Sequence, residues 1–398
     1  MGTIKKMEQL IEAHLAEYEV RPDIILEAPG RFHLIGDHSW YFKDKTLSMA
    51  VNLPVYFAVS VREDTAVRFY FHQLKERKRA NVSSMKYRKE DRWANAIKAI
   101  IYAFEEFGLH CKGMNITIWS DILPSSGFGI TTAMKVVSAL AFKELFHPEC
   151  DEVKLLKIIE LGNRQFLGVE NYVADIFTAM FSKADNCILT DHSKTSWSLV
   201  PFSFDDYSII LTDARVPRIT VWNEDLVRTP ENFLLLAELK VKKNNYWVYE
   251  DSEIEINDIL SGVNEDMRRR LLCIMKEHKN VMDAAEGLRT GNFQLFARAV
   301  NKSHEAMRDM FNISCPEIDW LVKRVLEFDS TSSARNPSAC SRVTGKGYSR
   351  CSYSIIKKTD VENYEQKLAE YERIFGFRAS YYEVKPADGA HVVESYSK

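Results

Sequence analysis

The chain has 398 residues, with 53 lysines and arginines against 56 aspartates and glutamates, so its net charge is −3. Hydrophobic residues make up 46% and charged residues 27%, which excludes a largely disordered chain and a collagen-like one. The length suggests two domains, and the balanced charge argues against a dedicated nucleic-acid-binding protein, which would carry a basic excess.

The first half of the chain alternates helical and strand-like patterns. An amphipathic helix is predicted over 1–18, where apolar residues recur at helical spacing. Beyond it we expect helices over 93–107, 131–145 and most of 151–181, and strands over 47–61 with a break at Pro54, 66–71, 114–119 and 186–190.

The second half mixes the same two kinds of element. The patterns predict helices over 265–288, 292–311, 318–327 and 361–375, and strands over 207–212, 353–357 and 379–384. Mixed elements in both halves indicate two α+β domains rather than one doubly wound sheet. A boundary near 201–205 gives domains of 1–203 and 204–398.

Several features argue against membranes, disulfides and nucleic acid. No apolar run approaches the roughly 18–20 residues of a membrane helix, and the N-terminal helix lacks the apolar core of a signal peptide. The seven cysteines are scattered without a CxxC pair, which indicates reduced thiols and a cytoplasmic location. The basic cluster 75–79 contains Glu76, so a solvated loop is favoured over nucleic-acid contact. We expect a monomer.

Four segments carry residues suited to chemistry, and the first is 28–41, APGRFHLIGDHSWY. A Pro-Gly pair and then Gly36 predict turns on either side of a short apolar stretch. Arg31 offers a fixed charge for phosphate, while Asp37 and His38 can hydrogen-bond sugar hydroxyls. By spacing alone, an ordinary surface salt bridge is the alternative.

The second segment is 123–133, LPSSGFGITTA, between a predicted strand and a predicted helix. Its glycines and serines let backbone N–H groups gather at a helix N-terminus, where the dipole favours phosphate. Thr131 or Thr132 could hold a metal ion or a phosphate oxygen. The Gly-Lys-Ser/Thr ending of a Walker A loop is missing, and an ordinary N-capped connection is the alternative.

The third segment is 168–177, where Asp175 lies in the apolar run of a predicted helix. A buried carboxylate needs a partner, so Asp175 is either a candidate base or an aspartate satisfied by a nearby group. In the fourth, 341–351 (SRVTGKGYSRC), Gly345 and Gly347 predict a tight loop before a strand. Such a loop could approach a nucleotide or simply turn a corner.

In this order the four segments resemble those of galactokinases, a family of the GHMP kinase superfamily. The first is similar to the signature GRxNLIGEHTDYNGG and runs without a gap to Leu47, Met49 and Ala50, which match the family's LPMA. The second is similar to PxGxGLSSSA, the third to FVGVxxGIMDQ and the fourth to RMTGGGFGGC. Matches at 277–304 and 314–319 extend the resemblance over almost the whole chain.

The resemblance implies a fold and a set of roles. The N-terminal domain would be like ribosomal protein S5 domain 2, the C-terminal domain ferredoxin-like, and the active site would lie in the cleft between them. Asp175 would take the proton from the anomeric hydroxyl of galactose or a related hexose, and Arg31 would stabilise that carboxylate and the phosphoryl group transferred from ATP.

The resemblance also assigns binding residues. Sugar hydroxyls would be held by Asp37 and His38, near which Trp40 and Trp222 could stack on a sugar face. The ATP phosphates would be bound by Ser126, Gly127, Gly129, Thr131, Thr132, Gly345 and Gly347, and Mg²⁺ by Thr132.

The chain departs from the family pattern at several of these positions. Trp40 replaces an aspartate that binds sugar hydroxyls, Asp37 replaces a glutamate, and Tyr172 replaces a glycine. The glycine pair of the phosphate loop is shifted by one position, and Ser349 and Arg350 replace two glycines.

Two hypotheses follow from these departures. One is an active sugar kinase with a reshaped pocket. The other is a catalytically weak or inactive galactokinase-like protein that binds sugar and ATP in a regulatory role. Retention of Arg31 and Asp175 favours activity, whereas Trp40 and the altered glycine loops favour the regulatory role.

Overall fold

The computed structural model describes residues 3–122, 127–217, 260–345 and 350–396. Contacts divide the chain into unit 1 (Met1–Arg31, Ala50–Ala184 and Ala387–Lys398) and unit 2 (Phe32–Met49 and Asp185–Pro386). Two of these boundaries fall inside long strands, so each unit is made of separate parts of the chain. The contiguous domains 1–203 and 204–398 stay a prediction.

A mixed sheet forms the frame of unit 1, in the order β12-β1-β2-β5-β3-β4. β3 and β5 pair in parallel, whereas β1 with β12, β2 with β5 and β3 with β4 pair antiparallel. The strands are β1 (Ile24–Ile35), β2 (Lys45–Val61), β3 (Ala66–Phe71), β4 (Glu76–Asn81), β5 (Met114–Ser120) and β12 (His391–Ser395).

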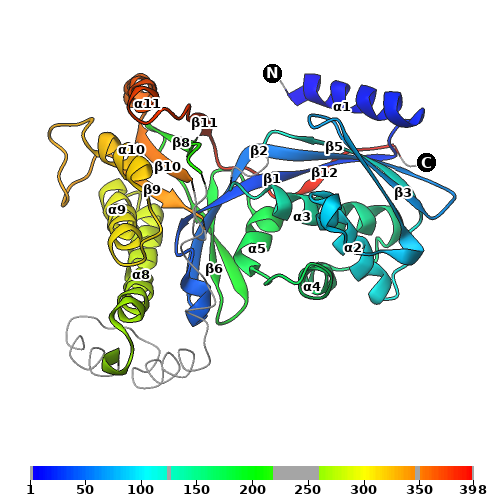
Figure 1. Ribbon diagram of the computed structural model, residues 1–398, viewed down its shortest axis with the longest axis horizontal. Helices are drawn as coiled ribbons and strands as arrows, with labels where there is room; N and C mark the ends of the chain where they lie inside the picture. The colour runs from blue at the N-terminus through cyan, green and yellow to red at the C-terminus, as the bar shows by residue number, and fades with distance from the viewer. Residues whose placement is uncertain (1–2, 123–126, 218–259, 346–349, 397–398) are drawn as a thin grey trace. The chain divides into compact units, whose positions relative to one another are not determined.

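Helices cover both faces of this sheet. α1 packs Met7 and Leu10 against Ile25, Tyr56 and Ala58 on one face, and Figure 1 shows α2, α3 and α4 on the other. The helices of unit 1 are α1 (Thr3–Tyr18), α2 (Ala94–Glu106), α3 (Ile130–Phe146), α4 (Glu152–Leu161) and α5 (Val173–Phe181). The short 3₁₀ helices are η2 (Val82–Ser84) and η3 (Lys89–Asp91), and a π-helical segment, η4 (Gly162–Phe166), continues α4.

Unit 2 contains an antiparallel sheet in the order β11-β8-β10-β9, with helices packed against it. A hairpin, β6 with β7, pairs with the start of β2 at Lys45–Ser48. The strands are β6 (Asn186–Asp191), β7 (Ser196–Pro201), β8 (Tyr207–Asp213), β9 (Cys340–Thr344), β10 (Cys351–Lys357) and β11 (Ser380–Val384). The helices are α8 (Glu265–Arg289), α9 (Phe293–Asp309), α10 (Pro316–Leu326) and α11 (Val361–Phe375), with short turns η1 (Ser39–Phe42), η6 (Leu260–Gly262) and η7 (Lys358–Asp360).

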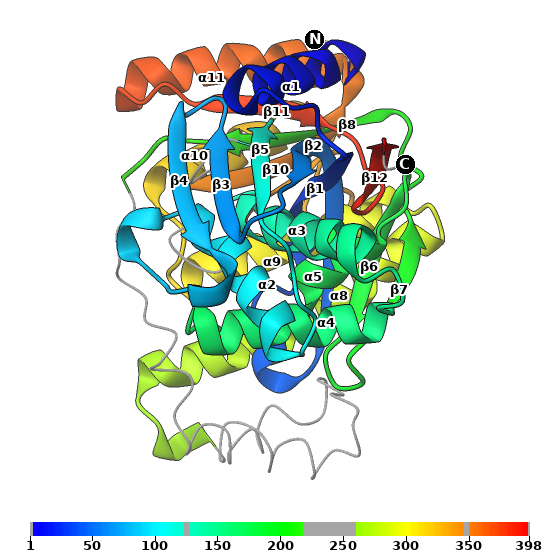
Figure 2. The ribbon, with the colours of Figure 1, turned by 90° about the vertical axis from the view of Figure 1, so that its right-hand side faces the viewer.

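The predicted α+β character is confirmed, and three local predictions are wrong. Pro54 does not break β2, because it falls between the stretch that pairs with β6 and the stretch that pairs with β5. The predicted turn at Pro29 and Gly30 lies inside β1. The basic cluster 75–79 largely forms β4 rather than a loop, and Figure 2 shows this charged strand at the outer edge beside β3.

The predicted helical region 151–181 is interrupted between η4 and α5, and β7, β9 and β12 were not predicted. Within the described ranges, no helix combines the length and the apolar character that crossing a bilayer requires.

Candidate active site

The candidate base and its arginine meet in unit 1. Arg31 Nη2 lies 2.6 Å from Asp175 Oδ2, and the two side chains keep only 14% and 7% of their exposure. Arg31 comes from β1, and Asp175 lies in the first turn of α5, where the helix dipole favours a negative side chain. A short, charge-assisted hydrogen bond in a largely dehydrated place fixes the position of the carboxylate.

The glycine loop lies directly against this ion pair. Gly129 precedes α3 with φ of 86°, and a Cβ added there would lie 2.9 Å from Arg31 Cγ. The backbone N–H of Arg31 donates to Phe128 O at 2.9 Å. Thr131 and Thr132 follow in the first turn of α3, directly after the loop that contacts Arg31.

A cavity of about 450 Å³ opens beside this loop in unit 1. It combines an aromatic and aliphatic wall with two cationic side chains, Arg92 and Lys135. The other lining residues are Phe71, Leu74, Tyr87, Trp93, Asn95, Ala96, Ile130, Thr131, Met134, Leu167 and Val169. Sequence reasoning missed this cavity and Lys135, although Lys135 follows Thr131 by one helical turn and therefore shares its face of α3.

In unit 2, Asp37 belongs to a buried ion pair. Arg342 Nη1 lies 2.5 Å from Asp37 Oδ2, and His33 Nδ1 lies 3.1 Å from Asp37 Oδ1. Burial alone would raise the pKa of Asp37, but the positive charge of Arg342 and the hydrogen bond from His33 outweigh it and hold that pKa well below its ordinary value. His38 is buried as well, with its ring stacked on Phe311.

The first and fourth sequence segments meet around this pair. Arg342 Nε also donates to Ser303 Oγ at 2.8 Å, and Arg342 Nη2 lies 3.4 Å from Glu277 Oε1. The backbone N–H of Gly36 donates to the same Glu277 oxygen at 3.1 Å. Sequence reasoning matched 277–304 to the family but assigned no role to Glu277 or Ser303, which hold the turn that presents Asp37.

Of the remaining predicted site residues, three are described by the structure and three are not. Trp40 is half-buried and packs against the hydrophobic core of unit 2, and Gly345 follows β9 with φ of 106°. Gly127 has φ of 82° in the glycine loop. The predicted residues Ser126, Trp222 and Gly347 lie outside the described residues.

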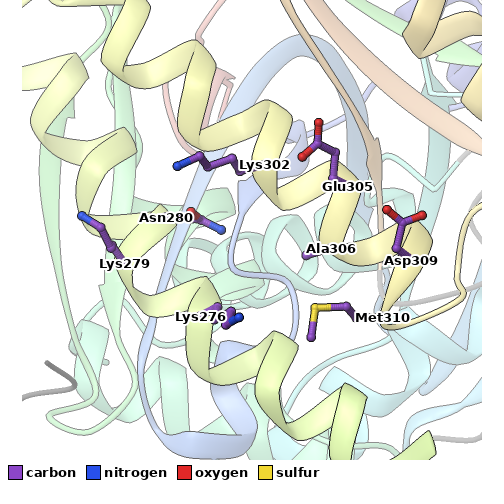
Figure 3. Close-up of a pocket in the computed structure, with 8 residues that line it drawn as sticks. All are labelled: Lys276, Lys279, Asn280, Lys302, Glu305, Ala306, Asp309 and Met310. Atoms are coloured by element: carbon purple, nitrogen blue, oxygen red, sulfur yellow. The ribbon is translucent and has the colours of Figure 1, made fainter. Parts of the chain in front are cut away.

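Two further cavities lie in unit 2, and neither contains a predicted site residue. One, of about 390 Å³, is lined from α8 and α9 by Lys276, Lys279, Asn280, Lys302, Glu305, Ala306, Asp309 and Met310 (Figure 3). The other, of about 450 Å³, is lined from α9, α10 and β9, with His304, Arg308 and Trp320 among its residues. Both mix acidic and basic side chains.

Comparison with known proteins identifies the fold. The crystal structure of Lactococcus lactis galactokinase complexed with galactose matches with a TM-score of 0.82 at 20% identity, covering 97% of this chain and 99% of that one. Methanococcus jannaschii mevalonate kinase matches with a TM-score of 0.63 at 15% identity, covering 92% and 99%. The GHMP kinase fold expected from the sequence is confirmed.

Family models and relatives identify the family. The galactokinase galactose-binding signature matches residues 12–61, and the GHMP kinases N terminal domain matches 95–183. Thermotoga maritima galactokinase is 28% identical over 92% of this chain and 99% of its own length. The Treponema pallidum protein named "Putative galactokinase" is 39% identical over 99% of this chain and 98% of its own length. The chain therefore belongs to the galactokinase family, as a galactokinase-like sugar kinase.

Proposed function

We propose that the chain transfers the γ-phosphoryl group of ATP to the anomeric hydroxyl of galactose or a related hexose. The observation that carries this proposal is the Arg31–Asp175 ion pair held against the glycine loop. Asp175 would accept the hydroxyl proton while the sugar oxygen bonds to the γ-phosphorus and the bond to the β-phosphate oxygen breaks. Arg31 would orient Asp175 and offset the negative charge of the phosphoryl group. The products are sugar 1-phosphate and ADP.

ATP fits the chemistry of the unit 1 cavity. Tyr87 and Trp93 offer aromatic surface for a nucleobase, and Thr131 lies at the N-terminus of α3, where the dipole favours phosphate. Mg²⁺ would enter with ATP, because protein-bound Mg²⁺ commonly shares its ligands with substrate phosphates. Among the described residues no cluster of three His, Cys, Asp or Glu could hold a metal, so Thr132 would add a single hydroxyl oxygen to ligands that the phosphates supply.

The sugar would be bound by Asp37 and His38, with Trp40 and Trp222 close to it. Both carboxylate oxygens of Asp37 already have protein partners, but a carboxylate offers about four lone-pair sites and can accept a further hydroxyl. We further propose that the protein is a monomer and that it lies in the cytoplasm; its seven free thiols support the location.

An ADP-release assay across a panel of hexoses tests the proposal. We expect turnover with galactose or a close relative, and phosphate on the anomeric oxygen of the product by ³¹P NMR. Binding of ATP without turnover on any hexose would contradict the proposal and favour a regulatory sugar- and ATP-binding protein.

The glycine loop gives a first testable prediction. We expect Gly129→Ala to lower kcat/KM by about 100-fold, because the new methyl group forces Arg31 or the loop to shift, and a displacement of about 1 Å at a reacting centre has an effect of this size. Gly108→Ala is the matched control: Gly108 also has positive φ, at 70°, but no atom lies within 4 Å of its added Cβ. Equal losses in both variants would attribute the effect to backbone strain alone.

A further inference from the structure

Lys135 places a buried positive charge in the wall of the unit 1 cavity. Its side chain is 7% exposed, and it lies one helical turn after Thr131 on α3. The Nζ donates to Asn163 Oδ1 at 2.6 Å, and Asn163 in turn donates to Asn171 Oδ1 at 2.7 Å. An ammonium group has three N–H donors, and this neutral amide satisfies one of them.

The charge of Lys135 has no ion-pair partner among the residues that the structure describes. Among the described residues no carboxylate lies within ion-pair distance of its Nζ, and Asp175 is paired with Arg31. Burial lowers the pKa of Lys135 to about 8, a shift that Asp175 opposes and Arg31 reinforces. A buried, unpaired ammonium is costly unless something else supplies the negative charge.

A second buried lysine of unit 1 shows the contrast. Lys98 Nζ lies 2.7 Å from Asp91 Oδ2 and also donates to the carbonyl of Lys86. That arrangement satisfies a buried lysine within the fold, and Lys98 does not line the cavity. Lys135 has no such carboxylate in the described part of the chain, and it does line the cavity.

We propose that Lys135 binds the phosphates of ATP, as a phosphate-contacting residue beside the glycine loop. This rests on the proposed function in that it takes ATP to be the occupant of the cavity. A triphosphate would supply both the missing negative charge and acceptors for the remaining N–H donors of Lys135. Arg31 contacts the same loop at Gly129, so Arg31 and the protonated Lys135 would together offset the charge of the polyphosphate.

Nucleotide binding by variants tests this role. We expect Lys135→Met to weaken ATP binding in calorimetry by about 10- to 100-fold, the loss typical of one charge-assisted hydrogen bond, and to leave adenosine binding unchanged. Lys143→Met is the matched control, because it removes the same charge from the same helix at a residue paired with Glu144. ATP affinity of Lys135→Met within twofold of the wild type, or equal losses for ATP and adenosine, would overturn the proposal.

The pH dependence of the wild type provides a second measurement that does not depend on folding of the variant. Asp175 and Arg31 are the charged groups that influence the pKa of Lys135, and Arg92 is the other charged side chain in the cavity lining. Lys135 loses its charge as the pH rises through about 8, so ATP affinity should fall between about pH 7.5 and 9.5 while adenosine affinity stays level. In Lys135→Arg the fall should disappear, because arginine stays charged. A flat ATP profile in the wild type would overturn the proposal.

These results are separable from those that test the kinase activity. A wild type that binds ATP with this pH profile but phosphorylates no hexose would contradict the proposed function and support the role of Lys135. An active wild type with an unchanged ATP affinity in Lys135→Met would do the reverse.

Discussion

The Asp175→Asn variant is expected to lower kcat for sugar phosphorylation by about 10²- to 10⁴-fold, the range that a positioned general base contributes. Asparagine keeps the size of the side chain and an oxygen that can accept from Arg31, so the ion pair becomes a hydrogen bond from a charged guanidinium to a neutral amide, with little displacement. What it loses is the ability to take the proton of the attacking hydroxyl. ATP affinity should stay within about twofold, because Asp175 bears no charge that attracts phosphate.

Steady-state kinetics and calorimetry on the same preparation measure the two effects separately. Glu17→Gln is a suitable control, since it also converts a carboxylate paired with an arginine, Arg77, into an amide in unit 1. Glu17 does not line the cavity, so its variant should keep the wild-type kcat. An Asp175→Asn enzyme with an unchanged kcat would show that another group accepts the proton.

The fold was predictable where a single element explains its own pattern. The prediction for α11 is correct to the residue, because its apolar spacing and the following Gly376 are local signals. The predicted turn at Pro29 and Gly30 is wrong because Gly30 is required by tertiary packing inside β1. A Cβ there would lie 3.0 Å from the carbonyl oxygen of Leu53, a contact that the sequence of 28–41 does not reveal.

The candidate site was predictable only in part, for a similar reason. Arg31 and Asp175 are 144 residues apart, and only the resemblance to galactokinases placed them together. Lys135 has no counterpart in the family motifs that this chain resembles. Its proposed role depends on its neighbour Asn163, which is close but carries no charge. The ion pair of Asp37 with Arg342 likewise could not be predicted, because it joins the first and fourth sequence segments within unit 2.

The Arg342→Met variant is expected to lower the free energy of unfolding by about 3–5 kcal/mol, the usual loss when one member of a buried ion pair is removed. Arg342 is fully buried, and its loss leaves the carboxylates of Asp37 and Glu277 buried without its charge. Since domains are stable by only about 5–15 kcal/mol, the variant should be markedly destabilised in urea unfolding. Arg308→Met, which breaks an exposed pair with Asp309, should lose less than about 1 kcal/mol.

The pH dependence of this loss distinguishes an uncompensated charge from a simple packing defect. In the wild type Arg342 and His33 keep the pKa of Asp37 below its ordinary value, so their contribution is present at neutral pH and lost as the pH falls below about 4. Without Arg342, burial becomes the dominant influence and raises the pKa of Asp37. Protonation of Asp37 then removes the unpaired buried charge as the pH falls. The stability difference between the two proteins should therefore shrink from about pH 7 to about pH 4.5. A difference that stays constant over this range would mean that Arg342 stabilises the fold through its packed volume and its hydrogen bonds to Ser303 and Val343. The positive charge of Arg342 would then not be what stabilises the buried carboxylate of Asp37.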